Sequence, residues 1–205
     1  MNDYTKYTIG VLSLQGAVSE HIAQIETLGA KAIAVKSLSE LQQVDALVLP
    51  GGESTAMRRL MHSSGLFQAL KSFDKPILGT CAGLILLANK LEGGEPPHLA
   101  KMNIQVQRNA FGRQVDSFQT DLMIKGFADS FPAVFIRAPY ISRIGSEVES
   151  AGGMAGQCCI CQARQFTGLC VSSGINIGYA CCRIVSTTAK RVVFIVNLRT
   201  SFRCP

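Results

Sequence analysis

Short apolar runs alternate with segments of helical periodicity along the first 149 residues, and this alternation constrains the fold more than any other feature. Residues 8–14 (TIGVLSL) predict a buried strand, and residues 17–30 follow with apolar positions three and four apart, as in an amphipathic helix. Repeated strand–helix–strand units favour a parallel sheet with helices on both faces. The sequence therefore predicts a three-layer α/β fold with a mostly parallel sheet of the flavodoxin-like type.

The same alternation continues through residue 144. Strands are expected at residues 31–36, 45–50, 76–78, 103–108, 117–124, 133–136 and 140–144. Helices are expected over residues 54–72, with Ser54 as the N-cap, and over residues 82–91. Because ligands of such sheets bind at the carboxyl ends of the strands, the turns that follow residues 50 and 78 are the natural places for a site.

The composition of the chain changes near residue 149. All 14 acidic residues precede residue 150, as do 14 of the 20 Lys and Arg residues and all three histidines. Residues 150–205 hold the other six basic residues, no acidic residue and seven of the eight cysteines. We therefore expect two regions: an α/β domain over residues 1–149, and an aberrant C-terminal segment over residues 150–205.

The charge and hydropathy patterns exclude some classes of function. The net charge of +6 is confined to residues 150–205, which lack the acidic residues that are interspersed on folded basic surfaces, so we do not expect a nucleic-acid partner. No apolar run reaches the roughly 18 residues that a membrane span requires. The N-terminus lacks the basic segment and cleavage site of a secretion signal. These features favour a cytoplasmic protein.

The segment GTCAG (residues 79–83) has the pattern of a nucleophile turn between a strand and a helix. In such a turn the middle residue, Cys81, adopts a strained conformation, and the start of the following helix favours its thiolate form. The amide of Ala82 would face a developing oxyanion. The alternative is a buried cysteine that acts as a small apolar side chain.

A second turn, LPGGES (residues 49–54), follows another expected strand. Gly51 and Gly52 let backbone N–H groups approach a ligand closely, which would complete an oxyanion hole near Gly52. The alternative is an ordinary glycine turn before a helix. The pattern gains weight from its position, because a neighbouring strand carries Cys81.

Five segments resemble one family closely: LQGAVSEH, LVLPGGESTAMRRL, PILGTCAGLILLA, VQRNAFGRQVDSF and VFIRAP. They are similar to the glutaminase subunit of pyridoxal 5′-phosphate synthase, a class I triad glutamine amidotransferase, and the similarity extends over about residues 8–149. The resemblance implies hydrolysis of L-glutamine to L-glutamate and ammonia. It also implies a heteromeric complex in which ammonia passes to a barrel-shaped synthase subunit, with no metal or cofactor in the glutaminase itself.

The resemblance also assigns roles to particular residues. Cys81 matches the nucleophile that forms a γ-glutamyl thioester, and Gln15-Gly16 matches the segment that faces the synthase subunit. The positions that match the glutamine-binding and oxyanion-hole residues are Gly51, Gly52, Glu53, Arg108, Ile136 and Arg137. From the residues alone, the two arginines could be solvated surface charges and Ile136 could be a core residue.

The catalytic base of the family has no counterpart in this chain. A cysteine amidase needs a general base and a carboxylate that orients it, and the family takes both from a His-Pro-Glu segment well after the position of Arg137. Residues 150–205 contain no His, Asp or Glu. The three histidines are weak substitutes: His21 is expected on a helix surface, His62 in the next helix and His98 in a loop.

A shifted reading frame after about residue 149 would explain both the missing base and the unusual composition. With suitable synonymous codons, residues 170–183 read one nucleotide later give Ala-Phe-His-Pro-Glu-Leu-Thr-Ser-Asp-Thr-Arg-Val-Val. A zinc site is the weaker alternative, because Cys158 and Cys161 form one C-x₂-C pair while the adjacent Cys181 and Cys182 lack a spacer. We expect little activity from this polypeptide as written, and an alternative role is a non-catalytic subunit that only docks on the synthase.

Overall fold

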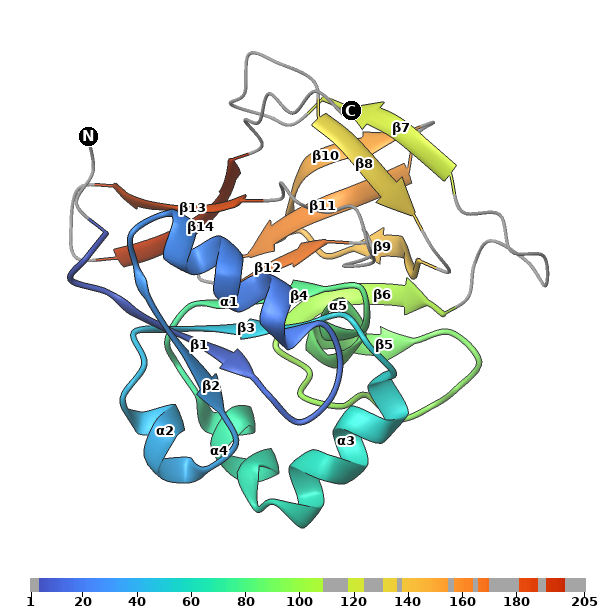
Figure 1. Cartoon of the computed structure of the whole chain (residues 1–205). Coiled ribbons are helices and arrows are strands. Elements are labelled where there is room, and N and C mark those ends of the chain that lie inside the picture. The colour runs from blue at the N-terminus through green and yellow to red at the C-terminus, as the bar shows by residue number, and fades with distance from the viewer. Residues whose placement is uncertain are drawn as a thin grey trace.

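The computed structural model describes residues 4–108, 118–123, 131–135, 138–154, 157–163, 166–169, 181–187 and 191–197. Its main sheet has the strand order β2 (Lys31–Val35), β1 (Thr8–Leu12), β3 (Ala46–Leu49), β4 (Ile77–Thr80), β12 (Phe166–Leu169), β11 (Gln157–Ala163), β9 (Tyr140–Ile144), β6 (Met102–Gln107) and β5 (Ala88–Leu91) (Figure 1). Strand β10 (Glu149–Met154) pairs with β11. The first five of these strands run parallel, whereas β12, β11, β9 and β6 pair antiparallel. The class of fold expected from the sequence, α/β with a parallel sheet, is confirmed.

The parallel half begins with β1 (Thr8–Leu12), β2 (Lys31–Val35), β3 (Ala46–Leu49) and β4 (Ile77–Thr80). Helix α1 (Val18–Thr27) lies on one face of these strands, and α2 (Leu38–Gln42), α3 (Ser54–Ser63) and α4 (Leu66–Ser72) lie on the other (Figure 1). This placement follows from right-handed crossovers, because the chain passes from β1 to β2 in one direction and from β2 through β3 to β4 in the other. The three expected layers are present.

Two expected helices differ from the structure. The helix expected over residues 54–72 is broken at Gly65, which has φ 73°, into α3 and α4. The helix expected over residues 82–91 ends early: α5 covers Ala82–Leu87, and Ala88–Leu91 forms β5, which pairs parallel with β6 (Met102–Gln107). The helix α2 was not expected from the sequence, although Ser37 and Glu40 form a capping box at its start.

The second half of the chain adds strands to the sheet and forms two hairpins. In chain order these are β7 (Phe118–Leu122), β8 (Phe131–Phe135), β9 (Tyr140–Ile144), β10 (Glu149–Met154), β11 (Gln157–Ala163), β12 (Phe166–Leu169), β13 (Cys181–Thr187) and β14 (Arg191–Asn197). Strand β12 lies against β4, while β7 pairs with β8 and β13 with β14 as separate two-stranded sheets. The chain thus inserts a late strand beside the expected nucleophile turn.

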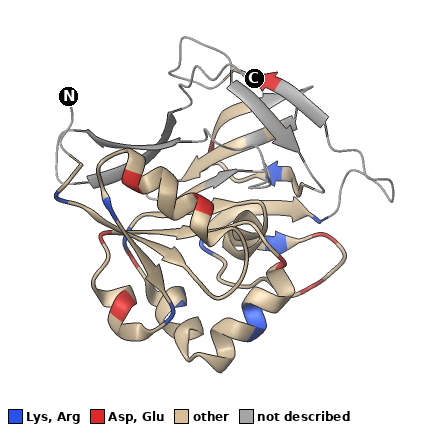
Figure 2. Ribbon diagram, in the orientation of Figure 1, with Lys and Arg blue, Asp and Glu red and all other residues tan. Residues whose placement is uncertain are grey.

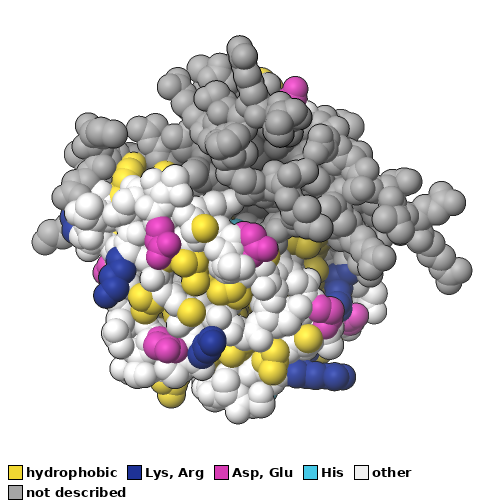
Figure 3. Space-filling model, in the orientation of Figure 1, with side chains coloured by type: hydrophobic (Ala, Val, Ile, Leu, Met, Phe, Trp, Pro, Cys, Tyr) yellow, Lys and Arg dark blue, Asp and Glu magenta, His cyan; other side chains and the backbone are white. Residues whose placement is uncertain are grey.

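The hydrophobic core fills the space between the parallel strands and their helices. Its fully buried large side chains come mainly from β1, β3, β4 and the helices α3 to α5, and they include Leu47, Leu49, Met57, Leu70 and Leu84. Lys and Arg are interspersed with Asp and Glu over these elements (Figures 2 and 3). Within the described residues, no helix combines the length and apolar character needed to cross a membrane.

Candidate active site

Cys81 lies where β4 turns into α5, at the carboxyl edge of the sheet. Its backbone has φ 48° and ψ −102°, a region that a residue with a side chain occupies only under constraint from its surroundings. The side chain is half-buried and is a thiol rather than part of a disulfide. The strained turn expected from GTCAG is therefore present, and Cys81 is not sealed in the apolar interior.

Close backbone packing explains the two glycines of this turn. A Cβ atom at Gly79 would meet the carbonyl group of Gly83 at 2.6 Å, and a Cβ at Gly83 would clash with the carbonyl oxygen of Leu49 on β3. Real Cβ atoms do not tolerate such contacts, so the turn can approach β3 only with glycine at these positions. The same packing holds the start of α5, and with it the amide of Ala82, against the strand that leads into the Gly51-Gly52 turn.

The Gly51-Gly52 turn is held by the segment that precedes α1. The amide of Ala17 donates to the carbonyl oxygen of Gly51 at 3.0 Å, and the amide of Glu53 donates to Oε1 of Gln15 at 2.9 Å. Gly51 is buried, whereas Gly52 is exposed. The turn expected to carry the second oxyanion donor is therefore fixed by Gln15 and Ala17, which flank Gly16 in the segment that the family resemblance places at the synthase contact.

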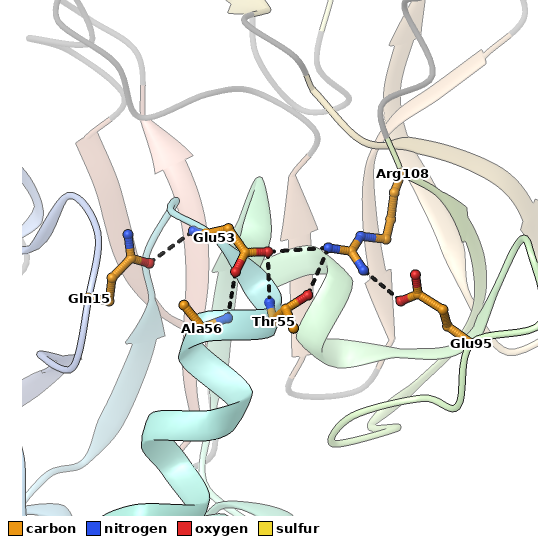
Figure 4. A network of polar contacts seen from close by, with 6 residues as sticks. All are labelled: Gln15, Glu53, Thr55, Ala56, Glu95 and Arg108. Atoms are coloured by element: carbon orange, nitrogen blue, oxygen red, sulfur yellow. Dashed lines mark hydrogen bonds and ion pairs between the residues drawn. The ribbon is translucent and has the colours of Figure 1, made fainter.

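Glu53 caps helix α3 and also binds Arg108 (Figure 4). Its two carboxylate oxygens accept hydrogen bonds from the amides of Thr55 at 3.0 Å and Ala56 at 2.6 Å. The cap expected at Ser54 is therefore one residue too late, because the longer Glu53 side chain reaches back over the free amides of the first turn. Partial burial opposes ionisation of Glu53, but these amides and the Arg108 charge keep its pKa below the ordinary value.

Arg108 follows β6 directly and lies between two carboxylates. Its Nη2 donates to Oε1 of Glu53 at 3.3 Å and to Oγ1 of Thr55 at 3.1 Å, and its Nη1 donates to Oε2 of Glu95 at 2.6 Å. The side chain is 22% exposed, so Arg108 is not the freely solvated surface charge considered from the sequence. An open cleft of about 600 Å³ lies beside this network and is lined by Thr55, Gln107, Arg108 and the 92–95 loop.

The surface position expected for His21 is wrong. His21 is 6% exposed, and its Nε2 lies 3.2 Å from Oγ1 of Thr80, the residue immediately before Cys81. Burial lowers the pKa of His21 to about 4, against a smaller raising effect of Glu20, so the ring is neutral at pH 7. The helix face could have been recognised from the sequence, because His21 lies four residues before the buried Ile25.

The other two histidines differ in burial and in their contacts. His62 is exposed and stacks on Phe67 with ring centroids 3.9 Å apart. His98 is 4% exposed, and neither ring nitrogen has a hydrogen-bond partner within the described residues. Burial, followed by the positive charges of Arg58 and Arg108, lowers the pKa of His98 to about 4.

Two predicted substrate contacts, Ile136 and Arg137, lie outside the described residues. The structure thus brings Gly51, Gly52 and Glu53 together with Arg108, and places Cys81 directly after the adjacent strand β4. Within the described residues, no three His, Cys, Asp or Glu side chains gather into a possible metal site. Sequence reasoning missed Gln15 as a side-chain contact of the turn, and Glu95 as the partner of Arg108.

A parallel α/β sheet with a strained cysteine turn beside a glycine turn is the arrangement of the class I glutamine amidotransferases. The chain belongs to the SNO glutamine amidotransferase family, whose model matches residues 11–175. A crystal structure of a glutamine amidotransferase is 36% identical, with a TM-score of 0.74, and the match covers 80% of this chain and 88% of that one. The fold and the family are therefore both established.

Curated relatives match the chain over most of its length. A pyridoxal 5′-phosphate synthase subunit PdxT from Actinobacillus pleuropneumoniae serotype 3 (strain JL03) is 99% identical over 149 residues, which are 73% of this chain and 78% of that protein. A subunit of the same name from Haemophilus ducreyi is 72% identical over 149 residues, 73% of this chain and 79% of its own length. The aligned length equals that of residues 1–149, whereas the family model continues to residue 175.

Proposed function

We propose that this chain is the glutaminase subunit of a pyridoxal 5′-phosphate synthase, which hydrolyses L-glutamine and supplies ammonia to a barrel-shaped synthase subunit. The names of the relatives and membership of the glutamine amidotransferase family support this assignment. A cytoplasmic location fits an enzyme of this kind. The single observation on which the chemistry depends is the backbone of Cys81, with φ 48° at the end of β4.

In the proposed reaction the Cys81 thiolate attacks the carboxamide carbon of glutamine. The amides near Gly52 and of Ala82 would stabilise the tetrahedral oxyanion, and the loss of one such donor typically costs about 3 kcal/mol. Collapse of the intermediate breaks the C–N bond and releases ammonia, which leaves a γ-glutamyl thioester on Cys81. Water then cleaves the thioester, so that glutamate leaves and the thiol is restored. Glu53, Arg108, Ile136 and Arg137 are the proposed glutamine contacts.

One group takes the proton of the Cys81 thiol, gives it to the departing nitrogen so that ammonia leaves, and then activates water; residues 150–205 contain no His, Asp or Glu for this role. We attribute this to a shifted reading frame after about residue 149. The register of β12 supports the proposal, because Leu169 lies opposite Thr80 in parallel pairing. In the shifted frame the His of His-Pro-Glu falls at position 172, three residues beyond Leu169 and past the same strand end that carries Cys81.

The second candidate is a subunit that docks on the synthase without catalysis. The absence of any His, Asp or Glu after Glu149 favours it for this polypeptide as written, whereas residues 1–149 retain the partner-facing Gln15-Gly16 and the glutamine-site residues. The two candidates make different predictions for turnover but the same prediction for binding at Cys81. The rate of glutamine hydrolysis therefore distinguishes the two candidates, whereas labelling of Cys81 does not.

The test is covalent labelling of the full chain with a chloroketone analogue of glutamine, followed by mass spectrometry of all eight cysteines. Selective modification of Cys81, prevented by excess L-glutamine, is the expected result. Equal modification of several cysteines, or no protection by glutamine, would refute the glutamine site. Glutamate release with the synthase subunit present, together with the nucleotide sequence of codons 148–151, then tests the lost base: turnover typical of an intact amidotransferase would contradict it.

A further inference from the structure

Glu53 and Glu95 share one guanidinium but differ in what else they bind. Both oxygens of Glu53 accept amides at the start of α3, so Glu53 cannot leave Arg108 without uncapping that helix. Among the described residues, the Glu95 side chain is bonded to Arg108 alone, and it is 52% exposed. Glu95 is thus the exchangeable carboxylate of the pair.

The loop that carries Glu95 has room to move. Gly93 and Gly94 precede it with φ 90° and 80°, and no atom lies within 4 Å of a Cβ built at either position. Two prolines follow, so the turn is bounded on the other side by residues of restricted φ. The Glu95 carboxylate can therefore shift across the cleft while the backbone on either side of residues 93–97 stays in place.

The charges of this site suit a zwitterion. Two carboxylates bind one guanidinium, and Glu92 also lines the open cleft, so negative charge exceeds positive charge among these residues. An α-amino acid brings a carboxylate, which can accept the hydrogen bond that Nη1 of Arg108 gives to Glu95, and an ammonium group, which needs an anionic acceptor. When the substrate carboxylate replaces Glu95 on Arg108, the displaced Glu95 becomes the available acceptor.

We propose that Glu95 is a substrate-binding residue: it pairs with Arg108 in the empty site and accepts the α-ammonium group of glutamine when the substrate carboxylate takes its place. This inference rests on the proposed function and extends it by explaining how one end of the substrate is recognised. Glu95 then selects for α-amino acids over simple carboxamide acids, because a ligand without the ammonium group gains nothing from it.

The test is calorimetric titration of the full chain and its Glu95→Gln variant with two ligands, L-glutamine and glutaramate. Glutaramate is glutamine without the α-amino group, so it retains the carboxylate and the carboxamide. We expect Glu95→Gln to weaken glutamine binding about tenfold, as for loss of one charge-assisted hydrogen bond at a partly exposed site. Glutaramate binding should be unchanged or tighter, because its carboxylate no longer competes with Glu95.

The matched control is Glu26→Gln, which removes the same charge from an exposed position on α1 that does not line the cleft. This variant should change glutamine affinity less than about twofold. Equal effects of Glu95→Gln on both ligands, or no effect on glutamine, would overturn the role of Glu95 while leaving the proposed function intact. Failure of the unaltered chain to bind glutamine would overturn both.

Discussion

Residues 4–108 and residues 149–169 contribute to the same sheet but supply different things to it. The first region provides nearly all the described core, the strained turn at Cys81 and the ion pairs of Arg108. The second provides β10, β11 and β12, of which β12 pairs with β4 beside the site, while residues 150–205 contain no His, Asp or Glu. The second region therefore supplies backbone beside the site, but it does not supply the imidazole and carboxylate that the family uses there.

The difference shows how little of a strand's placement depends on its individual side chains. Strand β12 needs only four residues of suitable character, Phe166 to Leu169, to pair with β4. Catalysis needs a particular imidazole and a particular carboxylate, for which strand propensity is no substitute. A change of reading frame can preserve the first requirement by chance and will almost never preserve the second.

Reading the gene from codon 150 onward in the proposed frame, one nucleotide later, should produce the largest effect. The restored chain would carry His-Pro-Glu beyond β12, and we expect its glutaminase rate with the synthase subunit to exceed that of the present chain by at least about a thousandfold. Glutamate release is the measurement, and the restored chain with Cys81→Ala is the control that should lose the gain. Equal glutaminase rates for the two chains would show that the side chains missing from the second region do not limit catalysis.

The dependence of stability on acid arises from residues 1–149, because residues 150–205 contain no His, Asp or Glu, and His21 in the first region contributes to it. His21 is neutral when folded, with a pKa of about 4 instead of 6.5, so the unfolded state binds more protons below pH 6.5. Its contribution to stability is complete above pH 6.5 and falls by about 3 kcal/mol as the pH drops to 4. The free energy of unfolding, measured with urea at several pH values in this range, should depend on pH with a shallower slope for His21→Asn than for the unaltered chain. His62→Asn, at an exposed ring, is the control that should keep the slope.

Ala100→Gly should stabilise the first region modestly. Ala100 has φ 54°, where an alanine is strained by about 1 kcal/mol and glycine is not. We expect a gain of about that size in the free energy of unfolding. Ala23→Gly, an exposed position within α1, is the matched control and should instead lose about 1 kcal/mol. Destabilisation by both substitutions would contradict the assigned backbone of Ala100.

The thiol of Cys158 reports on the second region. A hydrogen bond from Cys161 is the main cause that lowers the pKa of Cys158 to about 7, against the opposing effect of burial. Cys161→Ala should therefore reduce the rate of Cys158 alkylation by iodoacetamide at pH 7 by about threefold, since less thiolate is present. In concentrated urea the two chains should react alike. If the folded chains also react alike, β11 does not hold these thiols together.

The sequence predicted the parallel half well, because its strands are short apolar runs and its turns carry glycine. The strand expected at residues 31–36 matches β2, Lys31–Val35, to within one residue. The prediction failed where the secondary structure depends on residues that are distant in the sequence. Ala88–Leu91 was expected to be helical, although pairing with β6 makes it a strand. No local pattern distinguishes these outcomes in four residues.

The residues of the site were predicted, but the hydrogen bonds and ion pairs between them were not. The turn at Cys81, the glycine turn and Arg108 were all singled out, whereas the Glu95 partner of Arg108 depends on a loop whose geometry no periodicity encodes. The catalytic and binding roles of the residues in this site, together with those of Ile136 and Arg137, stay predictions.

Helix α1 is tied to both turns of the site at once. Its leading segment binds the Gly51 carbonyl, and its first turn places His21 against Thr80. A partner that binds Gln15-Gly16 would therefore contact a segment with two connections to the site, one to the carbonyl of Gly51 and one to Thr80 next to Cys81. Binding of such a partner would change the position of the glycine turn and that of the Cys81 thiol together, although the partner contacts neither of the reacting atoms.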